Sequence, residues 1–258
     1  PYRRQRQMCI RDSDCMRNTV STYIRRLRCI YNKAVENGDA EYIPGLFQGV
    51  FTGVESKRKK SLSLENQHKL MTVKVESEVL RETQLVVCLL FQYAGMSFVD
   101  FAHLKERNIK NGILDYNRQK TGTPMRLEIL DTAELMRKEL MGDKKPASGY
   151  LFPFLSGTKT GYEAYLEYNA ALSRFNRNLK ALKKAAGIAS DVTSYTIRHS
   201  FAMALKEQNV PIEMISELLG HKSIKTTQIY LRSFSLEKMT EVNSTCFGCV
   251  YNYVSKVG

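Results

Sequence analysis

Apolar residues recur at three- and four-residue spacing over positions 16–36, MRNTVSTYIRRLRCIYNKAVE. This spacing predicts one amphipathic helix, because side chains three and four residues apart share a helical face. Gly38 ends the pattern. The other face carries four bases, Arg25, Arg26, Arg28 and Lys33. Such a face is either solvated or in contact with phosphates, and the charge of the whole chain favours phosphate contact.

Two further helices are expected between Ser63 and Tyr93. Ser63 is a suitable N-cap for LENQHKLMTV, and Ser77 for the helix that Gly95 stops. The apolar run at 85–91 is far shorter than the roughly 20 residues of a membrane-spanning helix. It therefore predicts a buried helix and no association with a membrane.

A small sheet should follow. Asn111-Gly112 between two short strand-like runs is the strongest local signal for a type I′ hairpin. A third strand is expected at 125–130, after a polar turn, Arg118 to Gly122, that places Lys120 at the tip or shoulder of the sheet. Helices are expected at 132–141, 163–186, 194–208, 211–219 and 223–231. The fold class is mainly α with a small antiparallel β-sheet (α+β).

Charge suggests both a domain boundary and a partner. The 258 residues carry a net charge of +13, which attracts polyanions, so nucleic acid is the first partner to consider, ahead of a protein that is merely basic. The segment ESKRKKS at 55–61 has no apolar residue. We therefore expect a helical DNA-binding domain at 1–56, a basic linker at 57–62 and a larger domain at 63–258. The linker bases, Lys57, Arg58, Lys59 and Lys60, are expected to lie along DNA.

The six cysteines are scattered, and no secretory signal precedes them, which favours free thiols in a reducing, cytoplasmic compartment. Cys246 and Cys249 form a single CxxC, which lacks the second pair that a four-ligand zinc site needs. No metal is expected. Because the chain begins at Pro1, a preceding segment can have been removed.

The densest chemical information lies at 193–232, where short turns separate three expected helices. Arg198 is expected in the first turn of one helix, where unpaired N–H groups add to its charge and favour a phosphate. His221 follows Gly220 at a helix end, and Tyr230 lies in the next helix. Each residue alone has an ordinary structural explanation: a histidine after a helix end often contacts its carbonyls, and a helical tyrosine is usually core.

The spacing of these residues resembles the signature of the tyrosine recombinase (phage integrase) family. The matching residues are Arg198, the run Leu218-Leu219-Gly220-His221, and Tyr230 nine residues later. Leu231-Arg232-Ser233-Phe234 is similar to the branch found in bacterial conjugative transposons and related mobile elements. The segment 18–38 resembles the end of the family's helical core-binding domain, and the segment 117–121 resembles its hairpin lysine segment.

The resemblance implies a site-specific DNA recombinase with no cofactor. Tyr230 would attack a DNA phosphate and form a 3′-phosphotyrosine, a covalent bond that conserves the energy of the broken linkage. Arg198 and His221 would bind the phosphate oxygens, and Lys120 would protonate the departing 5′ oxygen. The implied partner is double-stranded DNA with inverted-repeat core sites. The protein would be a homotetramer in the synapse and a monomer when free in solution. The implied location is the bacterial cytoplasm, at the nucleoid.

Two positions depart from the family pattern. Tyr195 stands where a histidine or lysine is usual, and it offers a hydrogen bond without a charge. Ser97, in Ala94-Gly95-Met96-Ser97, stands where the first catalytic arginine is usual. Three bases in or beside the hairpin are better placed to replace that arginine than Arg81, about four helical turns away. They are Arg107, Arg118 and Arg126.

These departures leave a rival hypothesis, a catalytically degenerate DNA-binding protein of the same fold. A third is a relaxing enzyme like the type IB topoisomerases, which uses the same nucleophile without paired sites. The apolar residues at 247–251 are expected to dock either on a neighbouring protomer or on the protomer to which they belong.

Overall fold

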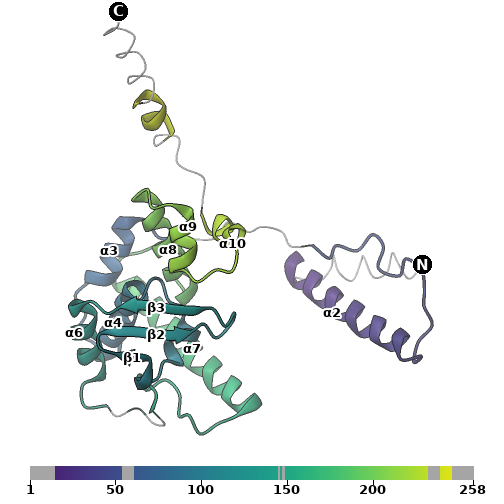
Figure 1. Ribbon diagram of the computed structural model, residues 1–258, viewed down its shortest axis with the longest axis horizontal. Coiled ribbons are helices and arrows are strands. Elements are labelled where there is room, and N and C mark those ends of the chain that lie inside the picture. The colour runs from purple at the N-terminus through teal and green to yellow at the C-terminus, as the bar shows by residue number, and fades with distance from the viewer. Residues whose placement is uncertain (1–14, 54–60, 145, 147–148, 232–238, 246–258) are drawn as a thin grey trace, which may run out of the picture. The chain divides into compact units, whose positions relative to one another are not determined.

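The computed structural model describes residues 15–53, 61–144, 146, 149–231 and 239–245, and only the backbone of Tyr230 (Figure 1). The bases at 57–60, the Ser233-Phe234 pair, three of the cysteines and the apolar segment at 247–251 lie outside these residues. The chain divides into two compact units, Pro1–Arg58 and Lys59–Gly258. Each unit is described by itself.

The described part of the first unit contains one long helix, α2 (Arg17–Glu36), at the position that the apolar stripe predicts. Residues 43–53 return along it. The Ser21 hydroxyl donates to the Gly53 carbonyl at 2.6 Å, and Tyr31 packs edge-to-face on Phe47. These contacts fix the segment after α2 against the helix.

The second unit is built around α4 (Glu78–Gln92), whose residues 83–90 are all buried. Helices α3 (Leu64–Thr72), α6 (Asp131–Met141), α7 (Gly161–Ala185) and α8 (Ser194–Glu207) contact it. The apolar run in its C-terminal half accounts for this burial, whereas Val79 near its start is 52% exposed. The Ser63 side chain accepts a hydrogen bond from the Asn66 N–H and caps α3 as expected, whereas the Ser77 side chain makes no such bond at the start of α4.

The sheet is antiparallel in the order β1 (Ile109–Lys110), β2 (Ile113–Asn117), β3 (Pro124–Glu128). Asn111 and Gly112 have φ of 52° and 75°, as the predicted type I′ turn requires. Along β2, Leu114 and Tyr116 are buried between exposed neighbours. A short helix that the sequence analysis did not predict, α5 (Phe98–Ala102), precedes a 3₁₀ turn, η1 (Glu106–Asn108), and the sheet.

The last two short helices are α9 (Ile212–Leu218) and α10 (Ile224–Tyr230). Pro211 is the N-cap of α9, so this helix begins one residue after the predicted start, and the Ser223 side chain makes no capping bond to α10. Ala202, Ile215 and Leu219 form a second, smaller core beneath them. The fold is therefore mainly α with a small antiparallel sheet, as predicted. No helix among the described residues is long and apolar enough to cross a membrane.

Candidate active site

Arg198 lies on α8, a helix that starts with a strong cap. The Thr193 hydroxyl accepts a hydrogen bond from the Thr196 N–H, and the Thr193 N–H donates to the Thr196 hydroxyl. Arg198 is the fifth residue of this helix and is only 3% exposed. Its guanidinium donates to the Gly95 carbonyl at 2.8 Å and also to the Leu219 carbonyl. Two partners of Arg198 are thus carbonyl oxygens of segments distant in the sequence, and Arg198 lies beyond the first helical turn that the sequence predicted.

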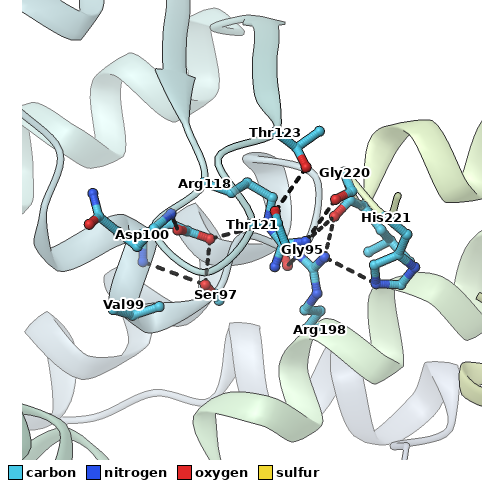
Figure 2. A network of polar contacts seen from close by, with 12 residues as sticks. Gly95, Ser97, Val99, Asp100, Arg118, Thr121, Thr123, Arg198, Gly220 and His221 are labelled. Atoms are coloured by element: carbon cyan, nitrogen blue, oxygen red, sulfur yellow. Dashed lines mark hydrogen bonds and ion pairs between the residues drawn. The ribbon is translucent and has the colours of Figure 1, made fainter. Parts of the chain in front are cut away.

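Arg118 brings a second guanidinium to the same carbonyls. It continues the buried positions of β2 by one step, after Leu114 and Tyr116, and is 8% exposed. Its Nη1 donates to the Leu219 carbonyl at 3.0 Å and to the Gly220 carbonyl at 2.9 Å. Figure 2 shows the two guanidinium groups meeting at this turn. We call Arg118 and Arg198, with the carbonyls of Leu219 and Gly220, the arginine clamp.

His221 lies beside the clamp. Its Nε2 is 3.5 Å from Nη2 of Arg198, and its Nδ1 is 2.8 Å from the Thr227 hydroxyl (Figure 2 shows the first contact). Thr227 is fully buried in α10, the helix that ends at Tyr230. The histidine ring is therefore oriented by the helix that carries the candidate nucleophile.

The turn at Gly220 needs a glycine for two reasons. Its φ of +60° is unfavourable for a residue with a side chain. A Cβ there would also lie 2.7 Å from Cδ of Arg118 and would collide with the Met125 sulfur. Gly220 therefore lets the sheet and the α9–α10 turn approach closely enough for the clamp to form.

Lys120 is exposed on the turn between β2 and β3. That turn is well ordered: the Gly122 N–H donates to the Arg118 carbonyl at 2.8 Å, and the Arg118 N–H donates to the Thr123 carbonyl at 2.9 Å. The Gln119 N–H donates to Oδ1 of Asp100, also at 2.8 Å. Lys120 thus extends from a turn whose base is tied to the clamp and to α5.

Only one of the arginines considered as replacements for the residue absent at Ser97 joins Arg198 in the described part of the chain. Arg81 is paired with a glutamate of α6, with 2.6 Å between Nε and the carboxylate. Arg107 in η1 and Arg126 in β3 are exposed. Arg118 is the one that reaches the clamp. The two-residue period of β2 was the sequence signal for its burial, but its partners lie about 100 residues further along the chain.

A tyrosine next to the clamp shows the electrostatics of the site. Burial raises the pKa of Tyr116 well above its usual range, and the Asp100 carboxylate raises it further, while Arg198 and Arg118 act in the opposite direction. Tyr116 is buried in the core and packs as part of β2.

Tyr195 is exposed on the first turn of α8. Its ring packs edge-to-face on His199, with 4.9 Å between the ring centroids, and His199 is buried. The structure thus places Tyr195 on the surface of the helix that carries Arg198.

The bases of α2 have local contacts. Arg25 donates to the Ser21 carbonyl and the Thr22 hydroxyl, and Arg28 lies 5.2 Å from the centre of the Phe47 ring. Arg26 is exposed. Within the described ranges, no group of three or more histidine, cysteine, aspartate or glutamate side chains is arranged to hold a metal ion.

Comparison with known proteins places this geometry in a family. The chain is 52% identical over 54 residues to the tyrosine recombinase XerD of Lacticaseibacillus casei, which covers 21% of this chain and 18% of that protein. It is 32% identical over 177 residues to XerA of Pyrococcus furiosus, which covers 67% of this chain and 57% of that protein. The chain thus spans less than two thirds of the curated relatives that it matches.

The fold agrees with this assignment. The Tn1549 transposon integrase, solved in complex with circular intermediate DNA, superposes with a TM-score of 0.62 at 15% identity, over 91% of this chain and 81% of that one. The model of the phage integrase family matches residues 60–237, more than half of the chain. The chain belongs to the phage integrase family and has the fold of a tyrosine recombinase.

Proposed function

We propose that this protein is a site-specific recombinase that cleaves and rejoins DNA through a 3′-phosphotyrosine formed by Tyr230. The observation that carries the proposal is the arginine clamp. Two buried guanidiniums meet at one turn, with His221 in contact with one of them. Their combined positive charge exceeds that of the one buried carboxylate beside them, Asp100, and the planar guanidinium fork matches the geometry of a phosphate.

The clamp leaves hydrogen-bond donors for that phosphate. Arg118 uses Nε toward Asp100 and Nη1 toward the two carbonyls, while its Nη2 has no acceptor among the residues that the structure describes. A guanidinium has five N–H donors. Arg118 can therefore fill the role of the first catalytic arginine absent at Ser97, with Nη2 on a non-bridging oxygen.

The reaction then proceeds by in-line displacement. The phenol of Tyr230 gives its proton to solvent water, its oxygen bonds to phosphorus, and the bond from phosphorus to the 5′ oxygen breaks. Arg198, Arg118 and His221 stabilise the negative charge of the pentavalent transition state. Lys120 protonates the departing 5′ oxygen as general acid. Tyr195 adds a neutral hydrogen bond, and no cofactor takes part. Attack of a 5′ hydroxyl on the phosphotyrosine reverses these steps.

The substrate that fits is double-stranded DNA with short inverted repeats around a crossover region. The net charge of +13 favours a DNA duplex, and the helix α2 presents Arg25, Arg26 and Arg28. We place Lys57, Arg58, Lys59 and Lys60 of the linker along the same DNA. Two protomers would occupy each site and four the synapse. Integration, excision or inversion of a mobile element is the proposed outcome, and the similarity to a transposon integrase supports it.

A second candidate is a DNA-binding protein of this fold that has lost catalysis. Ser97 favours it, since the arginine usual there is absent. The burial of Arg118 against the carbonyls that also hold Arg198 favours an active enzyme, because the lost cation is replaced in the same cluster.

Covalent trapping tests the proposal. A nicked duplex that carries the ends of the element releases a short 5′-hydroxyl fragment on cleavage, so the protein–DNA adduct accumulates. Wild type should form the adduct. Tyr230→Phe, which removes one oxygen, should bind the same DNA and form none, whereas Tyr162→Phe, an exposed tyrosine of α7, should match wild type. An adduct with Tyr230→Phe, or none with wild type, refutes the proposal. Strand exchange between two marked duplexes then separates a recombinase from a relaxing enzyme.

A further inference from the structure

Ser97, at the position where the family arginine is absent, contacts the start of α5 and Asp100. It is the N-cap of α5, and its hydroxyl donates to Oδ2 of Asp100 at 2.5 Å (Figure 2). The Asp100 N–H lies 3.5 Å from the same hydroxyl oxygen. The side chain of Asp100 is thus held by a residue three positions before it in the sequence.

Asp100 uses its two carboxylate oxygens for different partners. Oδ2 faces Nε of Arg118 at 3.5 Å, and Oδ1 accepts from the Gln119 N–H at 2.8 Å. Asp100 is 2% exposed, so these contacts are poorly screened by water. One carboxylate therefore holds both the side chain of the clamp arginine and the backbone of the residue next to Lys120.

The presence of serine makes this arrangement possible. A serine hydroxyl is short and neutral, and it can donate to a carboxylate without competing for its charge. The charge of Asp100 therefore remains directed at Arg118, the cation that enters from the hairpin. An arginine at position 97 would place a second cation at the Asp100 carboxylate, in competition with Arg118.

We infer that Ser97 and Asp100 are positioning residues that hold Arg118 in the clamp and the β2–β3 turn beside it, so that the binding of the phosphate and the delivery of the proton by Lys120 are coupled. This inference rests on the proposed function. It assigns a task to the serine that replaces the usual arginine, and it links the electrostatic and the acid–base parts of the site through one buried carboxylate.

A leaving-group experiment tests the coupling. Cleavage is measured with saturating protein on two nicked duplexes, one with the ordinary 5′-bridging oxygen and one with a 5′-bridging sulfur, which leaves without a general acid. Asp100→Asn should bind DNA within about threefold of wild type and cleave the oxygen substrate about 100-fold more slowly, the size expected for misplaced groups. The sulfur substrate should recover part of that loss, because only the defect at Lys120 is bypassed.

Two reference variants define full and absent recovery of the cleavage rate by the sulfur substrate. Lys120→Ala should be almost fully recovered by sulfur, and Arg118→Ala should not be recovered at all. Ser97→Ala should show a smaller defect of the same mixed kind, which Ser97→Thr, with its hydroxyl, should reverse. Asp115→Asn, an exposed aspartate of β2, should behave as wild type on both substrates.

The possible results distinguish failure of the proposed recombinase function from failure of the coupling through Asp100. If wild type makes no adduct on either substrate, the proposed function fails and the inference fails with it. If wild type cleaves and Asp100→Asn cleaves equally well, or shows the pure pattern of Arg118→Ala, only the coupling is refuted. If Asp100→Asn lacks a cooperative thermal transition, the comparison of Ser97→Ala with Ser97→Thr decides, and equal rates for those two variants refute the coupling.

Discussion

Replacement of Arg118 by lysine is the sharpest test of the arginine clamp. Lysine keeps the positive charge but has one ammonium group in place of the planar fork. In the structure that fork meets three acceptors at once, the carbonyls of Leu219 and Gly220 and the carboxylate of Asp100, at 3.0, 2.9 and 3.5 Å. One ammonium group cannot hold these acceptors and also reach a phosphate oxygen.

The size of the effect follows from what is lost. Removal of one preorganised donor from a charge-stabilising site typically costs about 10²–10³ in rate, about 2.7–4 kcal/mol. We expect Arg118→Lys to slow adduct formation by that factor with saturating protein, and to change DNA affinity by less than about threefold, since the charge is kept.

Arg126→Lys is the matched control. Arg126 is exposed on β3, opposite Asp115 in the sheet register, so its conversion should leave the rate unchanged. A melting curve for each variant separates loss of folding from loss of chemistry. A rate for Arg118→Lys within threefold of wild type, or an equal loss in Arg126→Lys, would refute the assignment of Arg118 to the first-arginine role.

Three further outcomes are expected. Ser97→Arg should leave cleavage unchanged or lower it, because the clamp already holds two cations, and a faster covalent-adduct rate would contradict the clamp. Gly220→Ala should lower the free energy of unfolding by more than the ~1–2 kcal/mol of backbone strain. Gly112→Ala, whose φ is also positive but whose Cβ would meet nothing within 4 Å, should show strain alone, so equal melting temperatures would contradict the close approach. Burial raises the pKa of the Cys88 thiol to about 11, so at pH 8 iodoacetamide should label the exposed Cys29 and spare Cys88, as peptide mass mapping would show.

Local patterns in the sequence were sufficient to predict most of the fold. The apolar stripe of 16–36, the Asn111-Gly112 turn and the capping residue Ser63 each determine structure through neighbours within a few residues. The errors have the same origin. Ser77 and Ser223 have the right residue type for a cap, but whether the side chain bonds to the helix depends on tertiary packing.

The site was less accessible to sequence alone. Arg198 and His221 could be selected because their spacing matches a family signature. The replacement for the absent arginine remained one of three candidates, because the choice depends on which base reaches Leu219 and Gly220 from the other end of the chain. Arg118 was expected in a polar turn, and its burial follows from the alternation of Leu114 and Tyr116, which continues one step beyond β2; no local pattern contains its partners.

The clamp is built on main-chain oxygen atoms, and this affects how the protein responds to mutation. The acceptors at Gly95, Leu219 and Gly220 are backbone carbonyls, which remain when the side chain at that position is substituted. An alanine scan would therefore detect the two arginines and Asp100 but would leave these three carbonyl acceptors in place. Replacement of single amides by esters weakens a carbonyl as an acceptor without altering any side chain. It would therefore measure how much each of these carbonyls contributes to holding the arginines.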